Sequence, residues 1–151
     1  MALTWSLTRF DALSPRALYD LLQLRSEVFV VEQGCAFQDL DGLDAQALHL
    51  LGHSEADGTL HAYARCLPPG LNYVEVSIGR VVIRASARGS GAGHALMRQA
   101  LACVALQWGA QPVRIGAQAR LEGFYRQYGF VPDGAPYDED GILHVAMVRA
   151  S

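Results

Sequence analysis

A glycine-rich turn between a strand and a helix is the feature that most restricts how this chain can fold. The sequence Val76–Ile83 is rich in Val and Ile, which is typical of a strand. Ala92–Trp108 repeats apolar side chains at helical spacing, and Gly109 follows as a C-terminal cap. Residues 88–93, between the two, read Arg-Gly-Ser-Gly-Ala-Gly. Glycines let the backbone approach a ligand, and the free N–H groups that begin a helix favour an anion. The unit therefore predicts a phosphate-binding loop.

Two familiar kinds of phosphate-binding turn do not fit this loop. A dinucleotide-binding turn needs Gly-x-Gly-x-x-Gly, but His94 stands in the last position counting from Gly89. It also needs an acidic residue about 20 positions after the loop, and no Asp or Glu occurs between the loop and position 122. A P-loop is excluded because the chain contains no Lys. The remaining form, Arg/Gln-x-x-Gly-x-Gly, is met by Arg88, Gly91 and Gly93, although a purely structural glycine turn would also give it.

The composition is that of a packed globular protein. With 151 residues, 51 % of them hydrophobic and 18 % charged, we expect one domain covering residues 1–151. No apolar run approaches the ~18 residues of a membrane span, and the N-terminus lacks the pattern of a secretory signal. Three cysteines without a Cys-x-x-Cys pair fit a reduced, cytoplasmic protein. No His or Cys cluster indicates a metal site, so we expect no bound metal.

The basic residues are unevenly distributed along the chain. All 12 are Arg, which excludes a lysine Schiff base. Residues 76–121 contain six of them and no Asp or Glu, so all 15 acidic residues lie elsewhere. The formal net charge of −3 argues against a general nucleic-acid binder. A positive segment inside an acidic chain indicates an anionic ligand on one side and a cationic ligand on the other.

Strand and helix patterns alternate along the sequence. Ser14 and Pro15 mark a helix start, and the apolar residues that follow share one helical face with Arg25. The expected strands cover residues 5–10, 48–54, 60–67, 76–83, 113–117, 130–131 and 143–148. The later helices are expected at 92–108 and 121–128. This order predicts an α/β fold with a mixed sheet.

Further runs of sequence accompany the glycine loop. Residues 121–130 include Phe-Tyr-x-x-x-Gly-Phe, and with the strand and loop they resemble the GCN5-related N-acetyltransferase (GNAT) superfamily over residues 76–130. Residues 21–33, Cys35 and the runs 38–42 and 137–142 are similar to the ElaA-like subgroup. The resemblance then spans most of the chain. It implies the GNAT fold, in which a mixed central sheet is flanked by helices and splayed strands form the acetyl-CoA cleft.

The resemblance also implies which residues bind the cofactor and act in catalysis. The pantetheine arm would pair with the strand before the loop, and the loop amides would hold the pyrophosphate. Tyr125 matches the tyrosine that protonates the departing CoA thiolate, and the N–H of Val82 the usual donor to the developing oxyanion. From the residues alone Tyr125 also fits a core aromatic, and we expect Tyr128 to pack. The implied cofactor-binding residues are Val81, Val82, Ile83, Arg88, Gly89, Ser90, Gly91, Ala92, Gly93 and Tyr125.

The resemblance leaves open which group takes the proton from the acceptor amine. An ordered water could serve, and each carboxylate also fits a solvated surface charge. Of the side chains, Glu32 joins Tyr125 and Val82 in the expected catalytic set. The candidate bases are Glu32, Glu75, Glu139 and His144.

Arg25 and two acidic runs have separate interpretations. Arg25 lies on an apolar helix face, where a buried Arg needs carboxylate or carbonyl partners. We expect it to fix the loop containing Glu32 or Asp41, with substrate binding as the alternative. The run 39–44 fails the pattern of a calcium loop, so it and the run 138–140 are expected to be turns. Either run could attract a cationic amine.

The function implied by the resemblance is an acetyl-CoA-dependent N-acetyltransferase acting on an amine of a small molecule or peptide. The attack would be direct, with Tyr125 as general acid. A CoA-binding sensor or interaction module without turnover is one alternative. An acyl-homoserine-lactone synthase is another, since those enzymes share an Arg-x-x-Val-Phe pattern similar to Arg25–Phe29, but their further Arg and Trp residues are absent. The acceptor, and the choice between monomer and homodimer, stay open.

Overall fold

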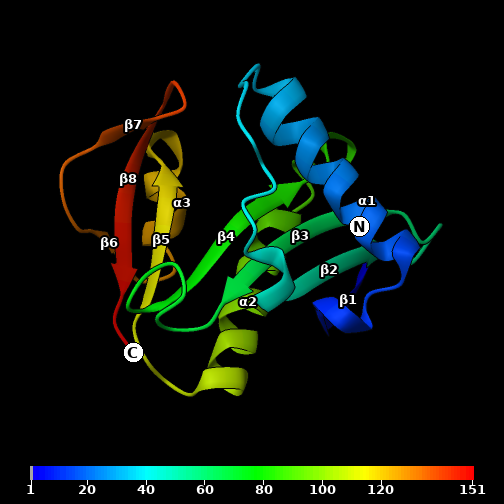
Figure 1. Cartoon of the computed structure of the whole chain (residues 1–151), viewed down its shortest axis with the longest axis horizontal. Helices are drawn as coiled ribbons and strands as arrows, with labels where there is room; N and C mark the ends of the chain where they lie inside the picture. Colours follow the sequence, from blue (N-terminus) through cyan, green and yellow to red (C-terminus); the bar gives the residue numbers. More distant parts are fainter. Residues whose placement is uncertain (1) are drawn as a thin grey trace.

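The alternating patterns of the sequence become one mixed sheet with helices on both faces, and the computed structural model describes residues 2–151 (Figure 1). The sheet has the order β1-β2-β3-β4-β5-β8-β6, and β7 pairs with β8. The strands are β1 (Leu3–Arg9), β2 (Leu48–Ser54), β3 (Leu60–Leu67), β4 (Val76–Ile83), β5 (Val113–Gln118), β6 (Phe130–Pro132), β7 (Tyr137–Glu139) and β8 (Ile142–Arg149). The helices are α1 (Pro15–Arg25), α2 (Ala92–Trp108) and α3 (Glu122–Arg126).

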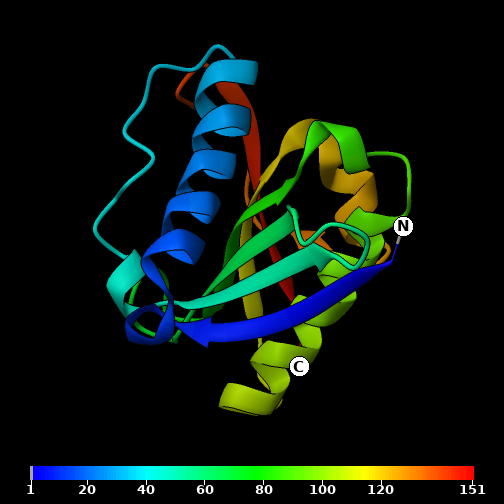
Figure 2. The same cartoon turned by 90° about the vertical axis from the view of Figure 1, so that its right-hand side faces the viewer.

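Different helices cover the two faces of the sheet. On one face α1 buries Leu21 and Leu24 against Tyr63 of β3. On the other face α2 buries Leu96 and Met97 in a larger core. Figure 2 shows the sheet edge-on, with α1 on one side and α2 and α3 on the other. Within residues 2–151, no helix combines the length and the apolar character that crossing a bilayer requires.

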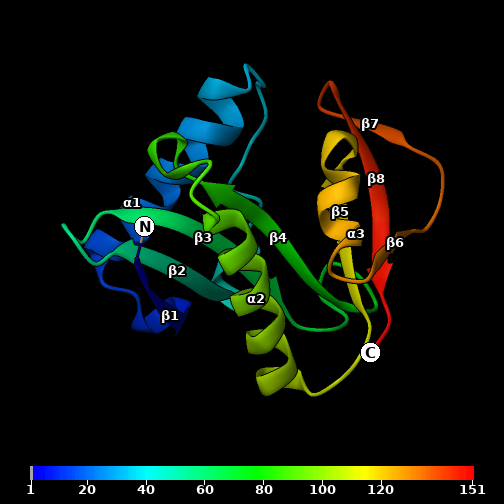
Figure 3. The same ribbon diagram turned by 180° about the vertical axis from the view of Figure 1, so that it is seen from behind.

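β4 and β5 are neighbours only where they begin. The two strands are parallel, and their pairing is confined to Val76 with Val113 and Ser77 with Arg114. Beyond this point β4 continues beside β3, and β5 continues beside β8. Figure 3 shows the two strands diverging, with α2 next to β4 and α3 next to β5. The sheet is therefore splayed at its centre, as the resemblance implied.

β4 carries a bulge in the region where it diverges from β5. Opposite β3, Gly79 pairs with Arg65 and Val82 pairs with Tyr63, so β4 has one residue more than β3 between these pairs. Arg80, inside the bulge, has a φ of 50°, which lies in the left-handed region that few residues other than glycine adopt. A bulge re-aims the groups around it. Here it changes the direction of β4 next to the splayed region.

The first helix starts as the sequence predicts and then changes character. Ser14 is the N-cap, and its side-chain oxygen accepts a hydrogen bond from the N–H of Ala17 at 3.0 Å. After Arg25 the chain continues as a π-helical segment, Ser26–Glu32. A π-helix has more residues per turn than an α-helix, so the spacing that defines the apolar face of α1 does not extend through this segment.

The predicted α/β class and mixed sheet are confirmed, with local corrections. The elements predicted at 48–54, 60–67, 76–83 and 92–108 have the observed bounds. The first strand is shifted to Leu3–Arg9, and the last helix is shortened to Glu122–Arg126. The expectation of a turn at 138–140 is wrong for Asp138 and Glu139, because both pair with β8 as part of β7.

Candidate active site

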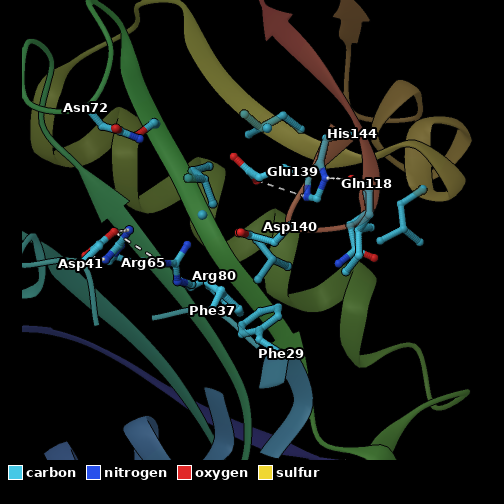
Figure 4. A pocket seen from close by; sticks show the side chains of 18 of the residues that line it. Phe29, Phe37, Asp41, Arg65, Asn72, Arg80, Gln118, Glu139, Asp140 and His144 are labelled. Atoms are coloured by element: carbon cyan, nitrogen blue, oxygen red, sulfur yellow. Dashed lines mark hydrogen bonds and ion pairs between the residues drawn. The ribbon is translucent and has the colours of Figure 1, made fainter. Parts of the chain in front are cut away.

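The divergence of β4 and β5 contains a cavity of about 360 Å³. Its walls come from both strands, from the end of the π-helical segment and the loop after it, from α3 and from the β7–β8 hairpin. Figure 4 shows Arg65 and Arg80 on one side of the cavity and Glu139 and His144 on the opposite side. The cavity thus brings together residues from both ends of the chain.

Tyr125 of α3 lines this cavity, as its expected role requires. Its side chain is 6 % exposed, and its ring lies edge-on to Phe124 and Phe130. Burial raises the pKa of Tyr125 to about 12, although the positive charge of Arg120 acts in the opposite direction. The phenol therefore keeps its proton at neutral pH and can act as a proton donor. Tyr128 does not line the cavity, and its hydroxyl lies 2.5 Å from His94 Nδ1 on α2.

The β7–β8 hairpin supplies the acidic wall of the cavity. His144 of β8 is 8 % exposed, and its Nδ1 lies 2.7 Å from the carbonyl oxygen of Ile142. Its Nε2 lies 3.4 Å from Oε2 of Glu139 on β7. The ring of Tyr137 stacks on the imidazole with a centroid distance of 5.9 Å. Asp140, in the turn between the two strands, also lines the cavity.

The loop after the π-helical segment reaches across the cavity to the C-terminal half of the sheet. The Cys35 thiol donates to the carbonyl oxygen of Asp140 at 3.0 Å, and Gln118 Nε2 of β5 donates to Gln33 at 3.3 Å. Burial, with Asp140 and Asp138 nearby, raises the pKa of the Cys35 thiol. A thiol with a raised pKa is a poor nucleophile at neutral pH. Cys35 is therefore better suited to closing the cavity than to covalent catalysis.

A buried ion cluster lies on the side of the cavity that contains Arg65 and Arg80. Arg25, with no exposed surface, donates from Nε to Asp39 at 2.9 Å and from Nη1 to Asp44 at 2.8 Å. Arg25 is thus buried and paired with the expected loop, but its partners are Asp39 and Asp44 rather than Glu32 or Asp41. The run 39–44 keeps the expected turn, since Asp41 accepts a hydrogen bond from the Leu43 N–H at 3.0 Å, and Arg25 binds the aspartates at its two ends. The ion cluster consists of Arg25, Arg65, Arg80, Asp39, Asp41 and Asp44.

The other half of the ion cluster faces the cavity. Arg65 of β3 binds Asp41 with two hydrogen bonds of 2.8 and 2.7 Å. Arg80 Nε lies 2.8 Å from Asp39 Oδ1, and Arg80 Nη2 donates to the Asp39 carbonyl oxygen at 2.9 Å. Arg65, Arg80 and Asp41 all line the cavity. With three arginines and three aspartates, the ion cluster has no net formal charge.

The glycine turn has the geometry of an anion-binding loop. Gly89 and Gly91 have φ values of 80° and 83°, and a Cβ at either position would meet no other atom within 4 Å. Gly91 is the N-cap of α2 and has no side chain that could bond the first N–H groups of the helix. These N–H groups and the helix dipole favour a phosphate. The loop is open enough for a phosphate-bearing ligand to approach its backbone.

Not every residue expected in the catalytic set lies in the cavity. Val81 lines it, whereas the Val82 side chain packs on the other side of β4 in the core beneath α1. Glu32 is exposed outside the cavity, and its carboxylate pairs with Arg88 Nη2 at 2.8 Å. Glu75 also lies outside and pairs with Arg114 at 3.0 Å. Of the four candidate bases, the cavity contains Glu139 and His144.

Sequence reasoning missed several residues that line the cavity. Phe29 and Phe37 come from the π-helical segment and the loop after it, and Gln118 ends β5. Asn72 and Tyr73 come from the loop before β4. The π-helical turn and the splay are tertiary features without a local pattern. A signal was available for Arg65 alone, as a charged residue inside an apolar strand pattern.

Comparison with known proteins agrees with this arrangement. A family model described as an acetyltransferase (GNAT) domain matches residues 46–150. Protein ElaA of Escherichia coli is 43 % identical over 147 residues, which are 96 % of this chain and 95 % of that protein. Its crystal structure matches with a TM-score of 0.91 at 41 % identity, covering 98 % of this chain and 99 % of that one.

A second solved structure is similar over the whole chain. It is an acyl-CoA N-acyltransferase from Pseudomonas aeruginosa, with a TM-score of 0.93 and 46 % identity, covering 99 % of this chain and 100 % of that chain. These matches, together with the splayed sheet, agree with the resemblance of residues 76–130 to the GNAT superfamily. They also agree with the resemblance of the N-terminal and C-terminal parts of the chain to the ElaA-like subgroup. The chain therefore belongs to the GNAT acetyltransferase family, within its ElaA-like subgroup.

Proposed function

We propose that the protein is an acetyl-CoA-dependent N-acetyltransferase that acts on an amine of a small molecule or a peptide. Membership of the family supports acyl transfer. The observation that carries the proposal is the cavity between β4 and β5, which Tyr125 lines. One of its walls is β4, the strand that leads into the glycine turn.

The donor side is assigned to β4 and the glycine turn. The main chain of Val81, Val82 and Ile83 would pair with the pantetheine arm, and residues 88–93 would hold the pyrophosphate. The open backbone at Gly91 and the uncapped N–H groups of α2 fit such a phosphate. When bound, acetyl-CoA supplies an acyl group that is activated as a thioester.

The catalytic groups follow from the charges that develop during acyl transfer. The Val82 N–H, beside the bulge, is assigned to the developing oxyanion. The Tyr125 hydroxyl is assigned to the departing sulfur, and its raised pKa keeps it protonated for that purpose. Both groups are fixed by secondary structure, so that neither has to be reordered during the reaction.

The acceptor side favours a cationic amine. The ion cluster is neutral as a whole, so its arginines do not offset the carboxylates of the opposite wall. Glu139 and Asp140 then give the acceptor side a negative charge. A protonated amine is attracted to such a wall, whereas a carboxylate would be repelled.

The experiment is a turnover assay with acetyl-CoA against pools of polyamines, amino acids, and peptides with Lys or free N-termini. We expect release of CoA with at least one pool, and mass spectrometry should show an acetylated amine. Tight binding of acetyl-CoA without turnover by any amine would instead support a CoA-binding sensor or interaction module.

A further inference from the structure

We propose that His144 is the general base that accepts the proton of the acceptor amine, and that Glu139 stabilises the imidazolium that results. The inference rests on the proposed acyl transfer and names a residue for its deprotonation step. It is carried by the hydrogen bonds of the imidazole, by its burial in the wall of the cavity, and by the pairing of the other candidates.

The partner of Nδ1 determines the form of the neutral imidazole. Nδ1 of His144 lies 2.7 Å from the carbonyl oxygen of Ile142. A carbonyl oxygen can only accept a hydrogen bond, so Nδ1 must carry the proton. In the neutral ring Nε2 then holds a lone pair. His144 is therefore held in the tautomer that presents a proton acceptor on its other side.

The lone pair of Nε2 and the carboxylate of Glu139 form a site for a cationic donor. Nε2 lies 3.4 Å from Glu139 Oε2, and two acceptors have no hydrogen to share between them. An ammonium group of the acceptor can donate to both. Once its proton has moved to Nε2, the imidazolium faces the carboxylate, and the ion pair stabilises it.

The ring is also shielded and oriented in a way that suits a base. The His144 side chain is 11 % exposed, whereas the Glu139 side chain is 56 % exposed, so the carboxylate lies nearer to solvent. The Tyr137 ring stacks on the imidazole at an angle of 28° and limits its rotation. His144 of β8 and Tyr125 of α3 line the same cavity. A base and an acid are thus both present in one site.

Other groups that could accept a proton are bound to partners elsewhere, two of them candidate bases from the sequence. Glu32 pairs with Arg88, and Glu75 pairs with Arg114, both outside the cavity. His49 is fully buried with both ring nitrogens engaged, Nδ1 with the Tyr63 hydroxyl at 2.6 Å and Nε2 with the Asp44 carbonyl oxygen at 2.9 Å.

One candidate inside the cavity is paired as well. Asp41 accepts two hydrogen bonds from Arg65 and lines the opposite wall. His144 differs from it in having a nitrogen that no donor of residues 2–151 occupies.

The proton balance of the reaction assigns each group one transfer. The amine nitrogen forms a bond to the thioester carbonyl carbon, the C–S bond breaks, and its electron pair goes to sulfur. The ammonium loses two protons in all. One leaves through His144 Nε2 to solvent, and the other replaces the proton that Tyr125 gives to sulfur. Neither an oxidant nor a further reactant is needed.

The first test compares His144→Gln with His53→Gln, a matched substitution on β2 outside the cavity. We expect His144→Gln to lower kcat about 100-fold or more, as loss of a general base does, with little change in the Kd for acetyl-CoA. His53→Gln should keep kcat. If His144→Gln keeps kcat within about threefold while Glu32→Gln loses it, the assignment is overturned in favour of Glu32.

Chemical rescue separates a base from a structural residue. His144→Gly leaves space for added imidazole, which should restore part of the lost kcat in proportion to its concentration. Glu139→Gln should lower kcat about tenfold, since it removes one charge interaction of the imidazolium, and Glu55→Gln is its control. Loss of activity without any rescue in a folded His144→Gly protein would argue for packing alone.

A measurement that needs no acceptor tests the geometry itself. Nitrogen NMR of the histidine ring at pH 8 should show His144 with the proton on Nδ1. A proton on Nε2 would refute the assignment. The outcome also differs from failure of the proposed function: a wild-type protein that turns over no amine refutes acyl transfer, and an active wild type with an active His144→Gln variant refutes the base alone.

Discussion

Arg80 Nε lies 2.8 Å from Asp39 Oδ1, and this ion pair ties the bulge of β4 to the loop after the π-helical segment. Arg80 Nη2 also donates to the Asp39 carbonyl oxygen at 2.9 Å, and the guanidinium lies over the Phe37 ring. The side chain is therefore anchored at a residue whose φ of 50° is unfavourable for Arg. These contacts hold the bulge, and they connect the loop after the π-helical segment to the strand assigned to the donor.

Replacing Arg80 separates the backbone cost from the side-chain contacts. Arg80→Ala removes the contacts and keeps the unfavourable φ, whereas Arg80→Gly removes both. We expect the glycine variant to be more stable than the alanine variant by about 1 kcal/mol, measured by urea unfolding. Both should lose kcat, because Asp39 no longer holds the bulge next to Val82. An alanine variant as stable as the glycine variant would show that the backbone is not strained.

The glycine turn can be tested against a second turn with similar geometry. Gly91 and Gly58 have φ values of 83° and 75°, and a Cβ at either would meet nothing within 4 Å. Val at either position should cost a similar stability, about 1–2 kcal/mol. Gly91→Val alone should weaken acetyl-CoA binding, by about tenfold for each ~1.4 kcal/mol of lost contact. Equal affinities in calorimetry for the two variants would remove the phosphate assignment.

The role of Tyr125 can be tested by removing its hydroxyl. We expect Tyr125→Phe to lower kcat about 10²-fold or more and to leave the affinity for acetyl-CoA nearly unchanged. Its Tm should stay close to the wild-type value, because within residues 2–151 the hydroxyl makes no hydrogen bond. The control is Tyr128→Phe, which loses the bond to His94 and should reduce stability while keeping turnover. Undiminished turnover in Tyr125→Phe would leave sulfur protonation to solvent.

The ion cluster predicts how stability depends on pH. Burial alone would raise the pKa of Asp44, but hydrogen bonds from Arg25 and Arg65 outweigh burial and lower it. Arg65 lowers the pKa of Asp41 in the same way. Because both pKa values are lower in the folded state, their stabilisation is complete above the unfolded pKa of about 4. The stabilisation is lost progressively as the pH falls below the unfolded pKa and then passes through the lower pKa values that the two aspartates have in the folded protein.

Urea unfolding at several pH values measures this dependence. We expect the wild-type free energy of unfolding to fall steadily from about pH 5 downwards. Asp44→Asn should be less stable at neutral pH and should show a shallower fall in acid. Asp11→Asn, at an exposed position, should keep the wild-type slope. If the free energy of unfolding of Asp44→Asn fell with pH as steeply as that of the wild type, other carboxylates would be responsible for the loss of stability in acid.

The strands and the long helix could be predicted because their signals are local. Val76–Ile83 and Ala92–Trp108 carry apolar periodicities that depend only on neighbouring residues. β7 could not be predicted, since Tyr137–Glu139 is short, exposed and acidic, and pairing with β8 is what makes it a strand. The burial of Arg25 followed from its helical phase. Its partners did not, because the chain beyond it winds as a π-helix.

The charge of residues 76–121 is a second feature that the sequence alone predicted incompletely. The sequence shows six arginines without a nearby acid, which suggests a free positive surface. In the structure four of the six pair with carboxylates from outside the segment, at positions that the linear order does not reveal. These arginines are Arg80, Arg84, Arg88 and Arg114. The proposed anion site therefore depends more on the backbone of the glycine turn than on net charge.

The two residue pairs that join β4 to β5 have a consequence for the order in which the protein folds. β1–β4 and the unit of β5, β6 and β8 each pair extensively within themselves, but only two residue pairs of the sheet join them, beside the core that both share with α2. The bond from Cys35 to Asp140 joins the two units across the cavity and spans 105 positions of the chain. Closing so long a loop is entropically costly, so such contacts form late. In native-state hydrogen exchange we expect the C-terminal unit to open as a block, before the amides of β2 and β3 are released.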